Sequence, residues 1–331
     1  MLHTTMKIIL FFLIISSFVF SSCQKDLEIF VPDPGQVNGP DSTWYNVISN
    51  TLPVATLKNR LLLPKQKDSF ILSTNISTLS TSEGLQCSFT SGSFLDPANQ
   101  PVTGMIQLES HLLKKKGDMI RMGTATTSMG SMLVSGGAYY IRLLKDGMPL
   151  NLAQNGNTYV KYADPTVSNL MGVFNAVETT TGSFTWLPNL DTLNNKVITS
   201  NQTYEILSNR LGWINCDYFY DTTNIPRTTV TAVLPAYYTN ANTIAYTVFN
   251  EMKSVIGMYG NETTRKFSTG KLPSNKQVTV VIISKQGEDY YLGHQQALTN
   301  TPISGSIGDQ LVVVTPVKTS IENIIAYLNI L

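Results

Sequence analysis

The chain has 331 residues, of which 23 are Lys or Arg and 22 are Asp or Glu, and its formal net charge is only +1. We therefore expect no nucleic-acid partner, because contact with a phosphate backbone requires clustered positive charge. Charged residues make up 14% of the chain. This scarcity, with abundant Thr, Ser and Asn, is typical of secreted β-rich proteins. The length suffices for two or three domains.

Residues 1–22 have the pattern of a signal peptide. Lys7 precedes an apolar run from Ile8 to Phe20, and Ser21 and Ser22 then lead to Cys23. As a helix, this run of about 13 residues would reach roughly 20 Å, which is short of the roughly 30 Å hydrocarbon core of a bilayer. A cleaved signal peptide is therefore favoured over a stable membrane span. Its removal takes away Lys7 and leaves 22 basic and 22 acidic residues.

The end of this segment, Phe20-Ser21-Ser22-Cys23, resembles the lipoprotein signals of Bacteroidetes, in which the cysteine thiol is lipidated before cleavage. The next residues, 24–28, resemble the surface-export tag of that group, although Leu27 interrupts the two acidic residues. The resemblance implies a lipid on Cys23 and anchoring in the outer membrane, with display on the cell exterior left open. Several acyl chains hold a protein durably in a bilayer. The alternative is an ordinary secretory signal.

Residues 23–45 are expected to form a flexible tether, because they hold turn-forming Pro, Gly, Asn and Asp clusters with little to bury. An N-terminal β-sandwich domain is expected over 46–163. Asp146-Gly147 predicts a hairpin turn, and Gly136-Gly137 predicts a break between two strands. Lys114–Arg121 is expected to hold one helical turn. The main strands are predicted at 69–73, 85–89, 102–113, 131–135 and 138–144.

Residues 164–226 are expected to form a middle β segment, which could continue the first domain. A C-terminal β-sandwich domain is expected over 227–331. Within it, Gln277–Ser284 has too little polar alternation for an edge strand, so we expect both of its faces to be buried. A helix is predicted over 319–329, with Thr319 and Glu322 as a capping box.

Three segments carry a wider resemblance, namely Pro101–Leu108 with Asp118–Ile120, then Thr126–Gly137, and Leu211–Asp217. They are similar to a widespread family of uncharacterised lipoproteins in Bacteroidetes, and the first half of the chain is weakly similar to ZU5-type β domains. The resemblance implies a β-sandwich architecture and brings no activity and no catalytic residues. The predicted fold class is all-β, with two or three β-sandwich-like domains in tandem and a short C-terminal helix.

Cys87 and Cys216 remain after lipidation, and an oxidising envelope would allow a bridge between them. We favour free thiols, because Cys87 lies in an alternating strand where a cysteine packs as a small hydrophobe. With His111 and His294, these cysteines show no recognisable zinc spacing, so no metal or other cofactor is expected.

The sequence holds few candidates for catalysis. Ser268 and Lys271 have the Ser-x-x-Lys spacing of penicillin-recognising enzymes, but the companion motifs are missing and Gly270 and Pro273 favour a loop. His294 follows a strand, where a hairpin-edge histidine is favoured over a member of a catalytic triad. The run Lys114–Lys116 favours a solvated loop, with contact to lipopolysaccharide phosphates as the alternative.

Trp213, Asn215 and Asp217 occupy alternate positions and should share one face of a strand. An exposed aromatic ring beside an amide and a carboxylate could hold a sugar by stacking and hydrogen bonds. We favour the alternative that Trp213 belongs to the core, and that Asn215 and Asp217 tie down neighbouring backbone at a domain junction.

These observations favour a lipid-anchored envelope protein that binds a glycan or a protein without catalysis. One alternative is an envelope hydrolase acting on glycan or peptide, with carboxylates brought together from distant strands. Another is a purely structural lipoprotein.

Overall fold

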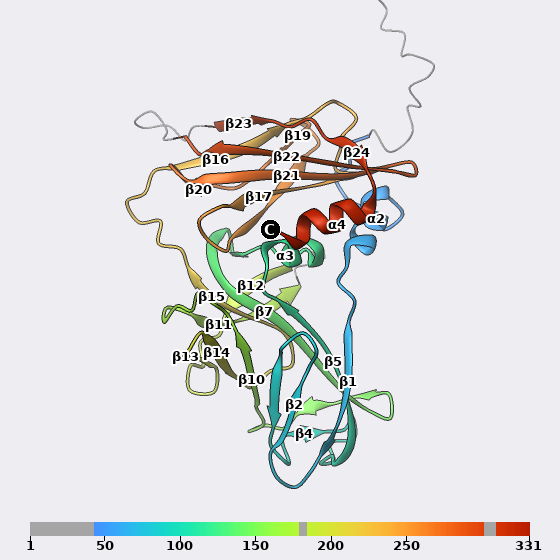
Figure 1. The fold of residues 1–331 in the computed structure, drawn as a ribbon, viewed down its shortest axis with the longest axis vertical. Helices are drawn as coiled ribbons and strands as arrows, with labels where there is room; N and C mark the ends of the chain where they lie inside the picture. The colour runs from blue at the N-terminus through green and yellow to red at the C-terminus, as the bar shows by residue number, and fades with distance from the viewer. Residues whose placement is uncertain (1–42, 179–183, 301–308) are drawn as a thin grey trace, which may run out of the picture. The chain divides into compact units, whose positions relative to one another are not determined.

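The expected all-β class is correct. Strands dominate a computed structural model that describes residues 43–178, 184–300 and 309–331, and the helices within those ranges are short (Figure 1). The signal peptide, Cys23 and nearly all of the expected tether lie outside these residues. The described residues belong to one compact unit.

The first half of the fold is a sandwich of two sheets. The first sheet, called sheet A, has the order β1-β5-β7-β15-β11-β12, with β6 and β8 paired to β7. Its strands are β1 (Gln66–Leu72), β5 (Gly104–Leu113), β6 (Thr127–Ser128), β7 (Ser131–Lys145), β8 (Met148–Pro149), β11 (Gly172–Glu178), β12 (Phe184–Pro188) and β15 (Gly212–Phe219).

The second sheet, sheet B, has the order β13-β14-β10-β3-β2. Its strands are β2 (Ser77–Ser80), β3 (Gln86–Phe89), β10 (Thr158–Ala163), β13 (Lys196–Ser200) and β14 (Thr203–Ser208), and a small pair, β4 (Phe94–Leu95) and β9 (Asn151–Leu152), lies outside both sheets. Side chains from the two sheets form one buried cluster, in which Cys87 of sheet B and Cys216 of sheet A both take part. The alternation of apolar residues that predicted these strands is therefore the alternation that fills the core.

The predicted break at Gly136-Gly137 is wrong, because β7 runs through both glycines as one strand. Cys216 pairs with Gly137 and Asp217 with Ser135, so Gly136 is the extra residue of a β-bulge. A Cβ atom at Gly136 would lie 2.8 Å from the Tyr204 ring, and Gly137 has a φ of +123°. The glycines bend the strand and admit a neighbouring ring, which is a role that composition alone does not reveal.

Other local predictions are confirmed. Asp146 and Gly147 both have positive φ and join β7 to β8, as a primed hairpin turn requires. The expected middle β segment includes an antiparallel pair, β11 and β12, whose connection lies outside the described residues. The predicted helical turn near Lys114 is α3 (Lys116–Met122).

The second half of the fold is a sheet of nine strands with the order β20-β16-β19-β18-β17-β21-β22-β24, in which β23 pairs in parallel with β16. The strands are β16 (Arg227–Val233), β17 (Thr243–Phe249), β18 (Val255–Asn261), β19 (Lys266–Ser268), β20 (Leu272–Pro273), β21 (Gln277–Gln286), β22 (Asp289–Leu298), β23 (Asp309–Val313) and β24 (Val317–Thr319). As predicted, β21 is buried on both faces, since its residues contribute to two separate apolar clusters.

Three helices, α2 (Pro53–Leu61), α3 and α4 (Ile321–Asn329), contribute with β17 and β21 to one of these clusters (Figure 1). The terminal helix begins two residues later than predicted, and its N-cap is Ser320, whose hydroxyl accepts from the Asn323 amide. Thr319 instead ends β24. Residues 44–61 also pack on strands of the C-terminal half, since Trp44 contacts Phe267 at a ring distance of 5.1 Å. The expected domain boundaries stay a prediction.

Candidate functional site

The structure places Trp213, Asn215 and Asp217 on β15, the strand between β7 and β11 in sheet A. Because the bulge residue Gly136 lies on β7, the alternation along β15 is kept and the three side chains share one face. Ile214 and Cys216 point to the opposite side, into the core of the sandwich.

Trp213 is half-buried in an aromatic group. Its ring stacks on His111, with ring centres 5.7 Å apart and planes 2° apart, and its centre lies 5.3 Å from that of Tyr140. Burial lowers the pKa of His111, and the nearby charge of Lys65 lowers it further. One face of the indole ring is thus already turned to the His111 imidazole.

Asn215 and Asp217 have almost no solvent contact, with exposed fractions of 1% and 0%. Nδ2 of Asn215 donates to Oδ2 of Asp217 over 2.5 Å, and the Ser135 hydroxyl donates to Oδ1 of Asn215 over 3.3 Å. Burial raises the pKa of Asp217 to about 8, although these polar neighbours and the charge of Lys253 oppose the shift. Neither side chain can touch a ligand without rearrangement.

Ser135, which donates to Asn215, also connects this buried pair to the C-terminal half. The Ser135 amide donates to the Lys253 carbonyl over 2.9 Å, and the Ser254 hydroxyl donates to the Leu133 carbonyl over 2.6 Å. The Lys253 ammonium group lies 2.5 Å from Oδ2 of the buried Asp164. Asn215 and Asp217 therefore lie near the junction between the first sandwich and the C-terminal half. Both interpretations of Trp213, Asn215 and Asp217 stay predictions.

The other candidate residues from the sequence are buried or in contact with neighbouring side chains. Cys87 and Cys216 are free and buried, and burial raises the pKa of Cys87 to about 12. Ser268 lies on β19, where its hydroxyl lies 2.9 Å from that of Thr231. The His294 ring stacks on Tyr327 of α4 at 4.7 Å.

The run Lys114–Lys116 is not simply a solvated loop, because two of its side chains form hydrogen bonds. The Lys115 ammonium group donates to the Asn329 carbonyl and that of Lys116 to the Phe249 carbonyl, both over 2.8 Å. Two of the three lysines thus help to fix α3 against the C-terminal half, which the charge pattern alone could not indicate.

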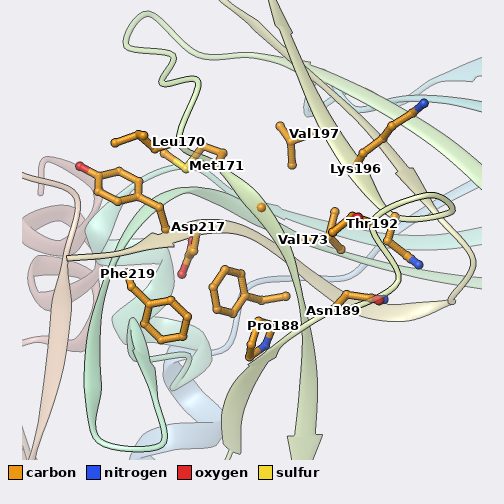
Figure 2. A pocket seen from close by; sticks show the side chains of 14 residues that line it. Leu170, Met171, Val173, Pro188, Asn189, Thr192, Lys196, Val197, Asp217 and Phe219 are labelled. Atoms are coloured by element: carbon orange, nitrogen blue, oxygen red, sulfur yellow. The ribbon is translucent and has the colours of Figure 1, made fainter. Parts of the chain in front are cut away.

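An open concave site lies at the side of the sandwich, between β11 and β13. This side pocket has a volume of about 390 Å³. Figure 2 shows Leu170 and Met171 along one part of its wall and Pro188, Asn189 and Thr192 along another. Its complete lining is Leu170, Met171, Gly172, Val173, Phe174, Pro188, Asn189, Thr192, Asn195, Lys196, Val197, Asp217, Tyr218 and Phe219.

Each part of the wall comes from a different element. Residues 170–171 cross from sheet B to β11, β15 contributes 217–219, and the connection from β12 to β13 contributes Asn189, Thr192 and Asn195. The fold thus leaves an opening where the edge of sheet A meets the edge of sheet B. Most of the lining side chains are apolar, whereas Lys196 adds a positive charge at an exposed position.

Exposed leucines lie on the two connections that contribute to this opening: Leu170 lines it, and Leu190 and Leu193 are next in sequence to the lining residues Asn189 and Thr192. Leu170, Leu190 and Leu193, which we call the leucine rim, are 70%, 88% and 84% exposed. Burying a leucine side chain is worth about 1.5–3 kcal/mol, so leaving three in water is unfavourable unless another surface covers them.

The loop that carries two of these leucines is held by Asp191. Its carboxylate accepts from the Asn194 amide over 3.3 Å, from the Asn194 side chain over 2.9 Å and from the Asn209 side chain over 3.4 Å. Its carbonyl accepts from the Asn195 amide over 3.0 Å. The bonds to Asn194 lower the pKa of Asp191, which therefore stays ionised. The leucines are presented on a loop with a fixed shape.

Sequence reasoning missed this site. Asp191, Asn194 and Asn195 together are a turn signal, and Leu190 and Leu193 within that turn could have been noted as apolar residues without a core to enter. Leu170 is distant in the sequence, and its approach to them depends on how the two sheets meet.

Comparisons with models of known protein families and with curated protein sequences found no match to this chain. Within the described ranges, no helix has both the length and the apolar character that a membrane crossing requires. The same residues hold no group of three or more metal-ligating side chains.

Proposed function

We propose that this chain is a lipid-anchored cell-envelope protein that binds a ligand at the side pocket without chemical conversion. The anchor would be Cys23, and the family would be the Bacteroidetes lipoproteins that the sequence resembles. Placement in the outer membrane, on either side of it, belongs to the same proposal. The signal pattern and the turn-rich segment after it support the anchor.

The observation that carries the binding function is the leucine rim beside an apolar pocket. An exposed apolar group on a fixed loop is typical of a surface that another molecule covers. The lining holds a single carboxyl residue, Asp217, whose side chain is wholly buried. Glycoside hydrolysis by acid–base catalysis uses two carboxyl groups that flank the scissile bond, so this pocket favours binding over that reaction.

A photo-crosslinking experiment in the native envelope tests the binding function. Benzoylphenylalanine in place of Leu193 should give light-dependent adducts. The same residue in place of Ile330, which is 82% exposed on the C-terminal segment, is the matched control and should give none above background. Equal adduct yields at both positions would contradict the proposed binding surface.

The anchor is tested separately. Incorporation of labelled palmitate should be lost in Cys23→Ala, and the variant should leave the membrane fraction. An unlabelled natural protein would remove the anchor from the proposal and leave the pocket as a separate question.

A further inference from the structure

We propose that the side pocket receives one large apolar side chain of a partner protein, and that an acidic residue of the same partner lies against Lys196. The inference rests on the proposed binding function and names the class of ligand. It follows from the lining of the pocket, from the charge at its mouth and from the rim.

The pocket suits a single anchoring side chain. Its volume of about 390 Å³ is at the low end for a small-molecule site, roughly 300–1,000 Å³. Met171, Val173 and Val197 bring it into contact with the core of the sandwich, because all three also pack at that core. A partner's aromatic or leucine side chain would therefore be desolvated on several sides, which is the setting of a binding hot spot.

The charge at the mouth favours an acidic neighbour of that side chain. Lys196 is exposed and, in the part of the chain that the structure describes, has no ion-pair partner. Asp191 is also exposed nearby in the sequence, but its carboxylate oxygens accept from the amides of Asn194 and Asn209. Asp217 is shielded by burial. The attraction between a partner carboxylate and the Lys196 ammonium group would offset the desolvation penalty of that carboxylate.

The rim favours a protein over a sugar or an acyl chain. A sugar ring is held by flat aromatic faces. Phe219 is the exposed aromatic side chain of the lining, at 46%, whereas the three rim leucines are 70–88% exposed. An acyl chain needs an apolar interior only. Leucines beside the pocket can be covered by the partner together with the anchor and can help to exclude water from it, as the contacts next to a protein hot spot do. Because Asp191 already fixes the loop, little conformational freedom is lost on binding.

The test uses a displayed library of random dodecapeptides, selected on the chain from Cys23 to Leu331. Enriched peptides should share a Trp, Phe or Leu with an Asp or Glu close by. Thr192→Trp places a large side chain at an exposed position of the pocket wall and should weaken binding by at least about tenfold. Thr103→Trp, at an exposed position outside the pocket lining, is the matched control and should leave binding unchanged.

Lys196→Glu tests the charge. It should weaken binding by roughly fivefold at low salt, and less at high salt, as expected for a partly exposed ion pair. Lys271→Glu, an exposed lysine outside the pocket lining, should have no effect.

Two outcomes would overturn the inference. One is the absence of any peptide enriched over the Thr192→Trp variant. The other is saturable binding of dodecanoate that Thr192→Trp abolishes while peptides do not bind. The second outcome would keep the proposed binding function and change its ligand, whereas failure of the Leu193 crosslinking would remove both.

Discussion

Asn215 donates a hydrogen bond of 2.5 Å to Asp217, two residues later on the same strand, and neither side chain reaches solvent. Oδ1 of Asp217 has no hydrogen-bond partner among the described residues. A carboxyl group with one unsatisfied oxygen in a dry site favours its protonated form, which explains the direction of its pKa shift.

Asp217→Asn should remove a pH dependence of stability. Burial raises the pKa of Asp217 in the folded protein to about 8, whereas a free aspartate has a pKa of about 3.9, so the folded protein binds a proton that the unfolded chain releases. The stabilising effect of this proton is complete below about pH 4 and is lost as pH rises toward 8. Each unit of pKa difference corresponds to about 1.4 kcal/mol. The free energy of unfolding of the natural protein should therefore fall between pH 4 and pH 8, whereas that of Asp217→Asn should not show this fall.

The measurement is urea unfolding at several pH values between 4 and 8, with Asp221→Asn as control. Asp221 is exposed and its pKa is lowered by hydrogen bonds from Thr223, so its replacement should leave the slope over this range in place. Parallel pH profiles for the natural protein and Asp217→Asn would show that Asp217 is charged in the fold.

Gly136→Ala should destabilise the first sandwich. The added Cβ would lie 2.8 Å from the Tyr204 ring, inside the core, where little can move. We expect a loss of about 1–3 kcal/mol in the free energy of unfolding, as for other overpacked sites. Gly257→Ala on β18 is the control, since its Cβ would meet no atom within 4 Å. Equal unfolding midpoints for both variants would contradict the close packing at the bulge.

The difference between these glycines shows where sequence reasoning ends. Alternation predicted strands such as β21, and Asp146-Gly147 predicted a turn, because both depend on neighbours in the chain. The bulge at Gly136 depends on a ring from the facing sheet. Similarly, the alternation of Asn215 and Asp217 predicts a shared face, but which segment covers that face is a tertiary property. The side pocket was missed for the same reason, since its wall is built from three separated segments, within 170–174, 188–197 and 217–219.

Lys253→Ala should destabilise the junction between the two halves. It leaves the carboxylate of Asp164, which is 2% exposed, without the ammonium group that lies 2.5 Å away. Removing one member of a buried ion pair costs about 3–5 kcal/mol. Because Lys253 is 21% exposed, we expect the lower end of this range, measured by thermal unfolding. The double variant Asp164→Asn, Lys253→Ala should recover part of the loss, and strictly additive effects would contradict a direct pairing.

Ser320→Ala should weaken the terminal helix. Its hydroxyl satisfies the Asn323 amide, and loss of an N-cap costs about 1 kcal/mol. Thr319→Ala tests the position expected from the sequence. Thr319 accepts only an exposed side-chain bond from Asn323, so its replacement should change the unfolding midpoint much less. A larger loss of stability in Thr319→Ala than in Ser320→Ala would show that Thr319 is the N-cap, as the sequence predicts.

Leu190→Ser and Leu193→Ser should leave the stability of the protein unchanged. Both side chains are more than four-fifths exposed, so their replacement creates no cavity, and surface substitutions of this kind stay within about 0.5 kcal/mol. The loop should keep its shape because Asp191 holds it through backbone and side-chain amides that neither substitution touches. Urea midpoints equal to that of the natural protein would therefore make these variants clean probes of binding. A lower midpoint would show instead that the leucines contribute to folding. Their exposure would then no longer support a ligand-binding surface.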